Sequence, residues 1–235
     1  MFCVYIDELS ISLCRARLGH MFVGALACAD NLVLLAPTPH AMRLMLQFCE
    51  EYAKDHDVLF NADTFKCIIS RPRGVASGDN LNHDICLTIS GNAIENVESW
   101  PHLGHVTTNN ASDKLDVLSR RGSFIGQVNN VICWFSKLDC CMKTRLLRAY
   151  CFSFYGCELW DLSNLHVQGL CLAWRQALRR IWKLPYNCHA AILERLSGAV
   201  SLFDSLYNRS LNFVRKCLNC NNILVDCCVT TCSIL

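Results

Sequence analysis

Long apolar segments and a high content of charge are both lacking in this chain of 235 residues. Charged residues make up 18% of the chain and hydrophobic residues 52%, a balance that disfavours disorder over most of its length. The longest apolar stretch runs from Met21 to Leu35 and is interrupted by Asp30 and Asn31. It is too short for a membrane span, which needs roughly 18 residues or more. We therefore expect no membrane partner.

The amino-terminal residues also lack the basic region and the small-residue cleavage site of a secretory signal peptide. We expect an intracellular protein, cytoplasmic or nuclear, that is not secreted. The 18 cysteines would suggest a disulfide scaffold in a secreted protein, but intracellular thiols stay reduced. Six of them have apolar neighbours in the sequence and are predicted to be buried free thiols. These are Cys28, Cys49, Cys86, Cys133, Cys151 and Cys171.

Signatures of two other chemistries are weak or missing. The chain has no Gly-x-Ser-x-Gly motif, so a nucleophilic hydrolase is poorly supported. The cysteines from Cys217 to Cys232 would be numerous enough to bind zinc, but Val214, Cys217 and Leu218 also fit an amphipathic helix, which we favour. His102 and His105 have a ligand-like spacing but no acidic neighbour in the sequence, and we expect them to be structural.

The first half of the chain has the pattern of a mixed α/β region. Apolar runs at Met21–Cys28 and Leu32–Leu35 flank Ala29-Asp30-Asn31, which suits a tight hairpin turn. Thr38-Pro39 is a typical helix start, and apolar residues follow a helical period from there to about Lys54. Short strands are expected at Lys66–Ser70 and Cys86–Ile89, with a loop over Arg71–Asn82 between them.

After about residue 110 the apolar spacing becomes helical. One helix is expected from Leu115 to Phe135, another around Leu146–Phe154, and a third from Leu170 to Trp182, ending before Pro185. The predicted fold class is therefore α+β: residues 1–110 form a small antiparallel sheet with helices, and residues 111–235 form an all-helical domain.

Charge is distributed unevenly between the halves. Residues 1–100 contain 7 Lys and Arg against 12 Asp and Glu, a balance of −5, whereas residues 101–235 contain 15 against 8, a balance of +7. Contact with a polyanion is therefore expected in the second half.

Several stretches together resemble the reverse transcriptases of LINE-type (non-LTR) retrotransposons. Cys28-Ala29-Asp30-Asn31 looks like the Tyr/Phe-Ala-Asp-Asp catalytic hairpin of that family, and His102-Leu103-Gly104 looks like its Tyr-Leu-Gly primer-grip turn. Phe60–Cys67 is similar to its Phe-Asn-x-x-Lys-Ser/Thr-Lys motif, and Phe2–Leu9 to the segment after its Gln-Gly and Leu-Ser-Pro signatures. Tyr155–Trp160 and Trp174–Arg180 resemble its thumb. The resemblance implies a partial polymerase palm over 1–110 and a thumb-like domain over 111–235.

The family carries out RNA-directed DNA polymerisation with Mg²⁺ held by three carboxylates, of which two come from the hairpin. Here Asp30 remains as a metal ligand, but its neighbour Asn31 is a neutral amide, and the strand that supplies the third carboxylate is expected to precede residue 1. Two-metal catalysis needs these carboxylates. We therefore expect an inactive palm-and-thumb fragment without a cofactor. Asp30-Asn31 would then act as an ordinary β-turn. A polymerase that tolerates Asn31 is the weaker alternative.

Basic residues in the thumb-like half are the predicted nucleic-acid contacts. Arg175, Arg179, Arg180 and Lys183 have the spacing of a single helical face, and Leu103 and Gly104 are the primer-grip-like pair. Lys143, Arg145 and Arg148 form a second set on the preceding helix. The alternative is a solvated helix face with no ligand. RNA or DNA is thus the expected partner, and the missing fingers segment or another protein would cover the palm.

Overall fold

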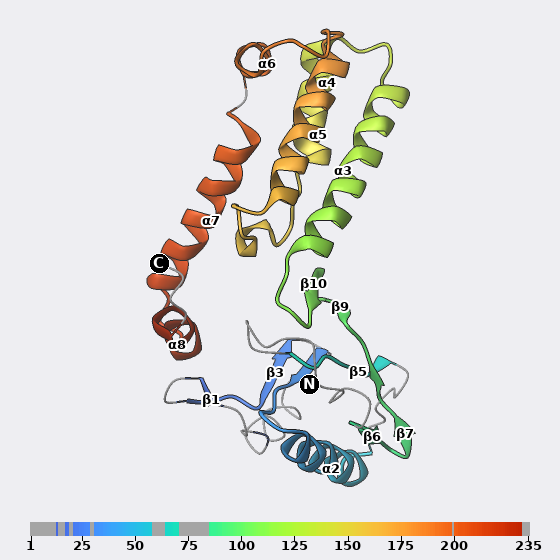
Figure 1. Ribbon diagram of the computed structural model, residues 1–235, viewed down its shortest axis with the longest axis vertical. Helices are drawn as coiled ribbons and strands as arrows, with labels where there is room; N and C mark the ends of the chain where they lie inside the picture. The colour runs from blue at the N-terminus through green and yellow to red at the C-terminus, as the bar shows by residue number, and fades with distance from the viewer. Residues whose placement is uncertain are drawn as a thin grey trace. The chain divides into compact units, whose positions relative to one another are not determined.

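The computed structural model describes residues 13, 17–18, 21–28, 31–57, 64–70, 85–198 and 200–231. The chain is a mixed α+β protein that divides into two compact units (Figure 1). The first unit comprises Met1–Glu98 together with Cys217–Leu235, and the second comprises Ser99–Lys216. Within the described residues no helix is long and apolar enough to cross a membrane.

The predicted hairpin is present in the first unit. Strand β3 (Ala25–Cys28) pairs antiparallel with β4 (Asn31–Leu34), and Cys28 lies opposite Asn31. The expected turn residues Ala29 and Asp30 lie outside the described residues. A shorter antiparallel pair, β1 (Arg17–Leu18) with β2 (Met21–Phe22), precedes this hairpin.

Helix α2 (Pro39–Asp55) begins where the sequence predicts. Thr38 has an extended backbone, and its Oγ1 accepts a hydrogen bond from the Ala41 amide at 3.2 Å. Pro39 occupies the first turn, where its missing N–H costs nothing. The apolar face of the helix contributes to two small clusters, one with Leu13, Met45 and Cys49, the other with Leu46, Leu87 and Ile89.

The other strands of the first unit are short. Strand β5 (Lys66–Cys67) pairs parallel with β8 (Glu95–Asn96), and an ion pair between Lys66 and Glu95 spans them with 2.6 Å between Nζ and Oε2. Strands β6 (Thr88–Ile89) and β7 (Asn92–Ala93) form a hairpin. The expected single antiparallel sheet is thus replaced, in the described part of the chain, by separate strand pairs, one of them parallel. Helix α8 (Ile223–Thr231) also belongs to this unit.

The second unit opens with a hairpin and continues as helices. Strand β9 (Ser99–His102) pairs with β10 (His105–Thr108). The helical elements are α3 (Lys114–Trp134), α4 (Cys140–Leu146), the π-helical turn η2 (Leu147–Cys151), the 3₁₀ turn η3 (Cys157–Leu159), α5 (Leu165–Ile181), α6 (Ala190–Ser197) and α7 (Leu202–Leu218). The helices predicted at Leu115–Phe135 and Leu170–Trp182 are confirmed by α3 and α5, whereas the one expected around Leu146–Phe154 begins earlier, at Cys140, and ends at Cys151. The units divide at Ser99 because the β9–β10 hairpin groups with α3.

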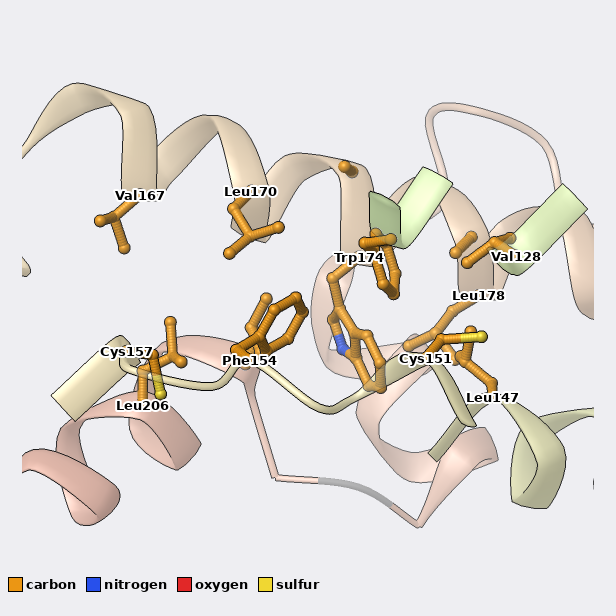
Figure 2. Packing of buried hydrophobic residues seen from close by; sticks show 14 of the residues in the cluster. Val128, Leu147, Cys151, Phe154, Cys157, Val167, Leu170, Trp174, Leu178 and Leu206 are labelled. Atoms are coloured by element: carbon orange, nitrogen blue, oxygen red, sulfur yellow. The ribbon is translucent and has the colours of Figure 1, made fainter. Parts of the chain in front are cut away.

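One large hydrophobic cluster holds the second unit together. Figure 2 shows Trp174 and Leu178 from α5 facing Val128, Leu147, Cys151 and Phe154. The Phe124 ring lies 5.8 Å from that of Phe154 and 5.9 Å from that of Trp174, centroid to centroid. Aromatic rings at these separations interact favourably beyond the area that they bury.

The expectation of buried cysteines is confirmed in part. Cys49 and Cys151 are buried and Cys171 is half-buried, but Cys28, Cys86 and Cys133 are exposed. Apolar neighbours in the sequence do not reveal which face of a strand or helix a residue occupies: Cys28 and Cys133 lie on exposed faces of β3 and α3, and Cys86 precedes β6. Burial raises the pKa of Cys151 to about 11, and burial together with the Glu50 charge raises that of Cys49 to about 11.

Candidate nucleic-acid interface

Leu103 and Gly104 form the turn between β9 and β10. The resemblance implied a turn at this position, but the two strands were not predicted. Both residues have left-handed backbones, with φ of 47° and 78°, as a two-residue hairpin turn requires. A Cβ on Gly104 would lie 3.3 Å from the Tyr155 ring, so the position is also sterically tight. The Arg120 guanidinium donates a hydrogen bond to the Gly104 carbonyl and lies 5.9 Å from the centre of the Tyr155 ring. The turn is therefore fixed on α3.

Asp116 on α3 is the buried centre of this arrangement. Its carboxylate accepts hydrogen bonds from the Trp160 indole N–H at 2.7 Å and from the Val106 amide at 3.2 Å. His105 Nδ1 lies 3.2 Å from Asp116 Oδ2, although the contact is not aligned as a hydrogen bond. His105 thus has an acidic neighbour after all, which the sequence spacing did not reveal. The network positions the turn and the hairpin, in agreement with a structural role for His105.

The β3–β4 hairpin, which was expected to resemble a catalytic hairpin, places an amide and not a carboxylate at the start of β4. Asn31 begins β4 and is exposed, while Asp30 lies outside the described residues. An amide supplies neutral ligand atoms where Mg²⁺ prefers carboxylates. Across the described ranges, no group of three His, Cys, Asp or Glu side chains is placed to hold a metal ion. Cys232, one of the cysteines considered for zinc, lies outside these ranges.

The basic residues of α5 are divided among different neighbours. Arg179 Nη2 donates to the Cys188 carbonyl at 2.8 Å, and Arg180 Nη1 donates to Asn129 Oδ1 on α3 at 2.8 Å. Arg175 Nε donates to the Cys171 carbonyl of its own helix at 3.3 Å. Lys183 lies beyond the helix end with a φ of 53°. The expectation that all four share one helical face is therefore wrong for Lys183, and Arg179 and Arg180 contact different neighbours of α5.

The basic residues of α4 and η2 reach the same region. The Trp182 indole donates to Thr144 Oγ1 at 3.1 Å, which brings Lys143 and Arg145 of α4 to the carboxyl end of α5. Lys143 Nζ donates to the Ser136 carbonyl at 2.8 Å. Arg148, in η2, donates to the Ser197 carbonyl at the end of α6.

Together these contacts define a basic end of the second unit, where α3 and α5 end and α4 and α6 begin (Figure 1). It consists of Lys137, Lys143, Arg145, Arg179, Arg180 and Lys183. Lys137 was not among the predicted residues, because it lies in the segment between two helices where no periodicity marks it. Arg175 and Arg148 flank the basic end along α5 and η2.

The cations of the basic end are not neutralised within the described residues. The second unit contains 15 Lys and Arg against 7 Asp and Glu, a balance of +8. Six of the seven acidic residues accept hydrogen bonds inside the unit, as caps or as buried anchors. They are Asp113, Asp116, Asp139, Glu158, Asp161 and Asp204. Arg120 and Arg209 form ion pairs in this unit, and among the described residues none of the six cations of the basic end does so.

Comparison with protein-family models, curated proteins and solved structures finds no match to this chain. The likeness to non-LTR reverse transcriptases therefore stays a prediction that depends on the quoted motifs.

Proposed function

We propose that the chain is a degenerate, reverse-transcriptase-like palm and thumb that does not polymerise DNA and that binds RNA or DNA without sequence preference through the basic end. The observation that carries the binding proposal is the set of cations without an ionic partner in the described part of the unit. A guanidinium has five N–H donors, and each hydrogen bond to a carbonyl or amide oxygen uses one of them. The charge of both arginines and most donors of exposed Arg180 therefore remain for phosphate, whereas the Nε–H of half-buried Arg179 is enclosed.

The hydrogen bonds of these side chains also favour binding. A side chain held by a carbonyl of its own chain loses less conformational freedom when it meets a ligand. Arginine suits phosphate because its planar donors match two oxygens at once. A helix carboxyl terminus attracts cations as well, so part of the pattern is explained by the α5 dipole without any ligand. Binding measurements separate the two explanations.

The proposed loss of polymerisation depends on Asn31. In the family that the sequence resembles, this position holds a carboxylate whose negative charge balances a divalent ion. The Asn31 amide is neutral and cannot do so. The purified 235-residue chain should give no template-dependent primer extension with Mg²⁺ or Mn²⁺. Extension above that of a heat-inactivated sample would contradict this part of the proposal.

Binding is tested on the full chain by fluorescence anisotropy with labelled oligonucleotides over a range of salt concentrations. Phosphate contacts release counterions, so log affinity should fall by about 0.7–0.9 per contact for each unit of log salt concentration. Four to six contacts give a slope of roughly −3 to −5, with a Kd of ~10⁻⁴ to 10⁻⁶ M at physiological salt. Unrelated sequences should bind with similar affinity.

The best variants are those that remove charge without removing a packing contact. Arg145 is exposed, and its guanidinium donates to Met142 Sδ of its own helix at 3.9 Å. Lys183 has a left-handed backbone that asparagine also adopts readily. Arg145→Gln and Lys183→Asn together should flatten the slope by about 1.4–1.8 if both contact phosphate. Lys114→Gln, at the opposite end of α3, is the matched control and should leave the slope unchanged. A folded chain without salt-dependent binding would refute the binding proposal.

A further inference from the structure

Two large aromatic side chains are almost fully exposed in the second unit. Trp134 at the end of α3 is 80% exposed, and Tyr186 between α5 and α6 is 90% exposed. The other described tryptophans are buried or at most about half as accessible as Trp134, and exposing an indole of this size forgoes a large burial energy. Packing within the unit therefore does not explain the exposure of these two side chains.

Both aromatics belong to the basic end. Helices α3 and α5 run parallel, since Arg121 lies beside Gly169 and Asn129 binds Arg180. Trp134 follows Asn129 by little more than one helical turn, and Tyr186 follows the end of α5, so they emerge at the same end of this helix pair. Lys143 Nζ donates to the carbonyl of Ser136, two residues after Trp134.

The segment that carries Tyr186 is fixed by hydrogen bonds on both sides. The Cys188 amide donates to the Pro185 carbonyl at 3.1 Å, which closes a turn with Tyr186 in its second position. The Cys188 carbonyl in turn accepts from Arg179. One of the phosphate-binding candidates thus also holds the base of this turn, and the ring is presented outward on an ordered segment.

We propose that Trp134 and Tyr186 are stacking platforms for unpaired bases, and that the basic end therefore prefers single-stranded RNA or DNA to duplex. This inference depends on the proposed function and specifies its substrate. The face of a base is accessible to an aromatic ring only when the base is unpaired or splayed out, and stacking does not require a particular base. Cations that contact phosphates beside exposed rings are the combination that non-specific single-strand binding uses.

Charge complementarity favours nucleic acid over a protein partner at this surface. The two rings lie at the same end of the α3–α5 pair as the six cations of the basic end, and none of these cations forms an ion pair in the described structure. An apolar protein partner would have to desolvate those charges or supply acids to match them. Phosphates supply matching charge at regular intervals along the strand.

The test compares an unlabelled oligothymidine and an oligouridine with a duplex of equal length, each competing against a labelled single strand for the full chain. The single strands should bind about tenfold more tightly than the duplex at the same salt concentration, because only they offer a base to stack. Trp134→Ala and Tyr186→Ala should each weaken single-strand binding about tenfold with little effect on duplex binding and no change in salt slope. Trp134→Phe and Tyr186→Phe should retain most of the affinity. Tyr207→Ala, an exposed tyrosine on α7, is the matched control and should change nothing.

The outcomes separate this inference from the proposed function. Equal affinity for single strand and duplex, with aromatic variants that bind like the unmodified chain, would overturn the stacking proposal while leaving salt-dependent binding intact. Absence of salt-dependent binding to any strand would overturn both. If the aromatic variants instead abolish a concentration-dependent self-association in sedimentation experiments, without affecting nucleic-acid binding, the surface is a protein interface and the stacking proposal is wrong.

Discussion

The two units of this chain use similar proportions of apolar residues but bury them differently. In the described residues of the first unit, α2 and the short strands enclose two clusters of three buried residues each. In the second unit, nineteen buried residues form one continuous cluster along α3, α5 and their neighbours. Long amphipathic helices bury a continuous stripe, whereas two-residue strand pairs cover little area. We therefore expect the second unit to be much the more stable.

The largest expected effect tests that large cluster. Phe154 is 2% exposed and contacts three other aromatic rings, so Phe154→Ala should destabilise the second unit by about 3–5 kcal/mol. All five tryptophans lie in the second unit, so fluorescence-detected denaturation reports on this unit alone. Phe213→Ala, at an exposed position on α7, is the control and should cost about 1 kcal/mol or less. Equal effects of the two substitutions would show that the cluster is loosely packed.

The helices and turns of both units could be predicted from sequence because their signals are local. Thr38-Pro39 marks the start of α2, and the two turn residues Leu103-Gly104 connect β9 and β10. The contacts that build the sites are not local: Trp160 meets Asp116 across 44 residues, and Arg180 meets Asn129 across 51. Periodicity places a residue on a helix, but only packing decides which neighbour its side chain meets.

The same reason explains what the sequence missed at the basic end. The spacing of Arg179 and Arg180 indicated a shared face, but they are about 100° apart around the helix and contact different neighbours. Trp134 is the last residue of α3 and lies five residues beyond Asn129, which meets Arg180 next to the end of α5, so its ring extends past this neighbour and is exposed. Helix length relative to its neighbours cannot be read from one helix alone.

The next effect concerns the attachment of α7 within the second unit. Arg209 donates two hydrogen bonds to Glu158 Oε1, at 2.6 and 2.9 Å, and another to the Phe154 carbonyl at 3.0 Å. Arg209→Gln should therefore destabilise the unit by about 2 kcal/mol at pH 7, less than a fully buried pair because both side chains retain some exposure. Arg195→Gln is the control for loss of an exposed charge and should have little effect.

This effect should depend on pH with a defined sign. Burial alone would raise the pKa of Glu158, but backbone hydrogen bonding and Arg209 outweigh it, and the pKa is lowered below its ordinary value of 4.5. A carboxyl with a lowered folded-state pKa contributes stability above pH 4.5 and loses it as pH falls below that value. The difference between the unmodified chain and Arg209→Gln should shrink between pH 5 and pH 3. A difference that stays constant over this range would assign the effect to the Phe154 carbonyl bond.

One buried thiol in each unit allows the opening of the two units to be compared directly. Cys49 in the first unit and Cys151 in the second are each 2% exposed, and the pKa of each is raised to about 11. Their intrinsic reactivity toward iodoacetamide is therefore similar, and the labelling rate reports how often each unit opens. Cys49 should react at least about tenfold faster, which corresponds to an opening free energy lower by about 1.4 kcal/mol. Equal rates, measured by mass spectrometry of the peptides, would contradict the proposed difference in stability.

The smallest expected effect removes the same kind of helix cap from each unit. Thr38 caps α2 through the Ala41 amide, and Asn164 caps α5 through the His166 amide at 3.0 Å. Either residue replaced by Ala should cost about 1 kcal/mol, because one amide at the helix start loses its partner. We expect α2 to exchange through local opening, so Thr38→Ala should speed amide hydrogen exchange of α2 about fivefold. In the second unit, Asn164→Ala should fray only the first turn of α5, since the large cluster holds the rest. Thr38→Ser keeps the acceptor and is the control. If Thr38→Ala accelerates exchange in α5 as strongly as in α2, the units open together and their division into a weak and a strong one is wrong.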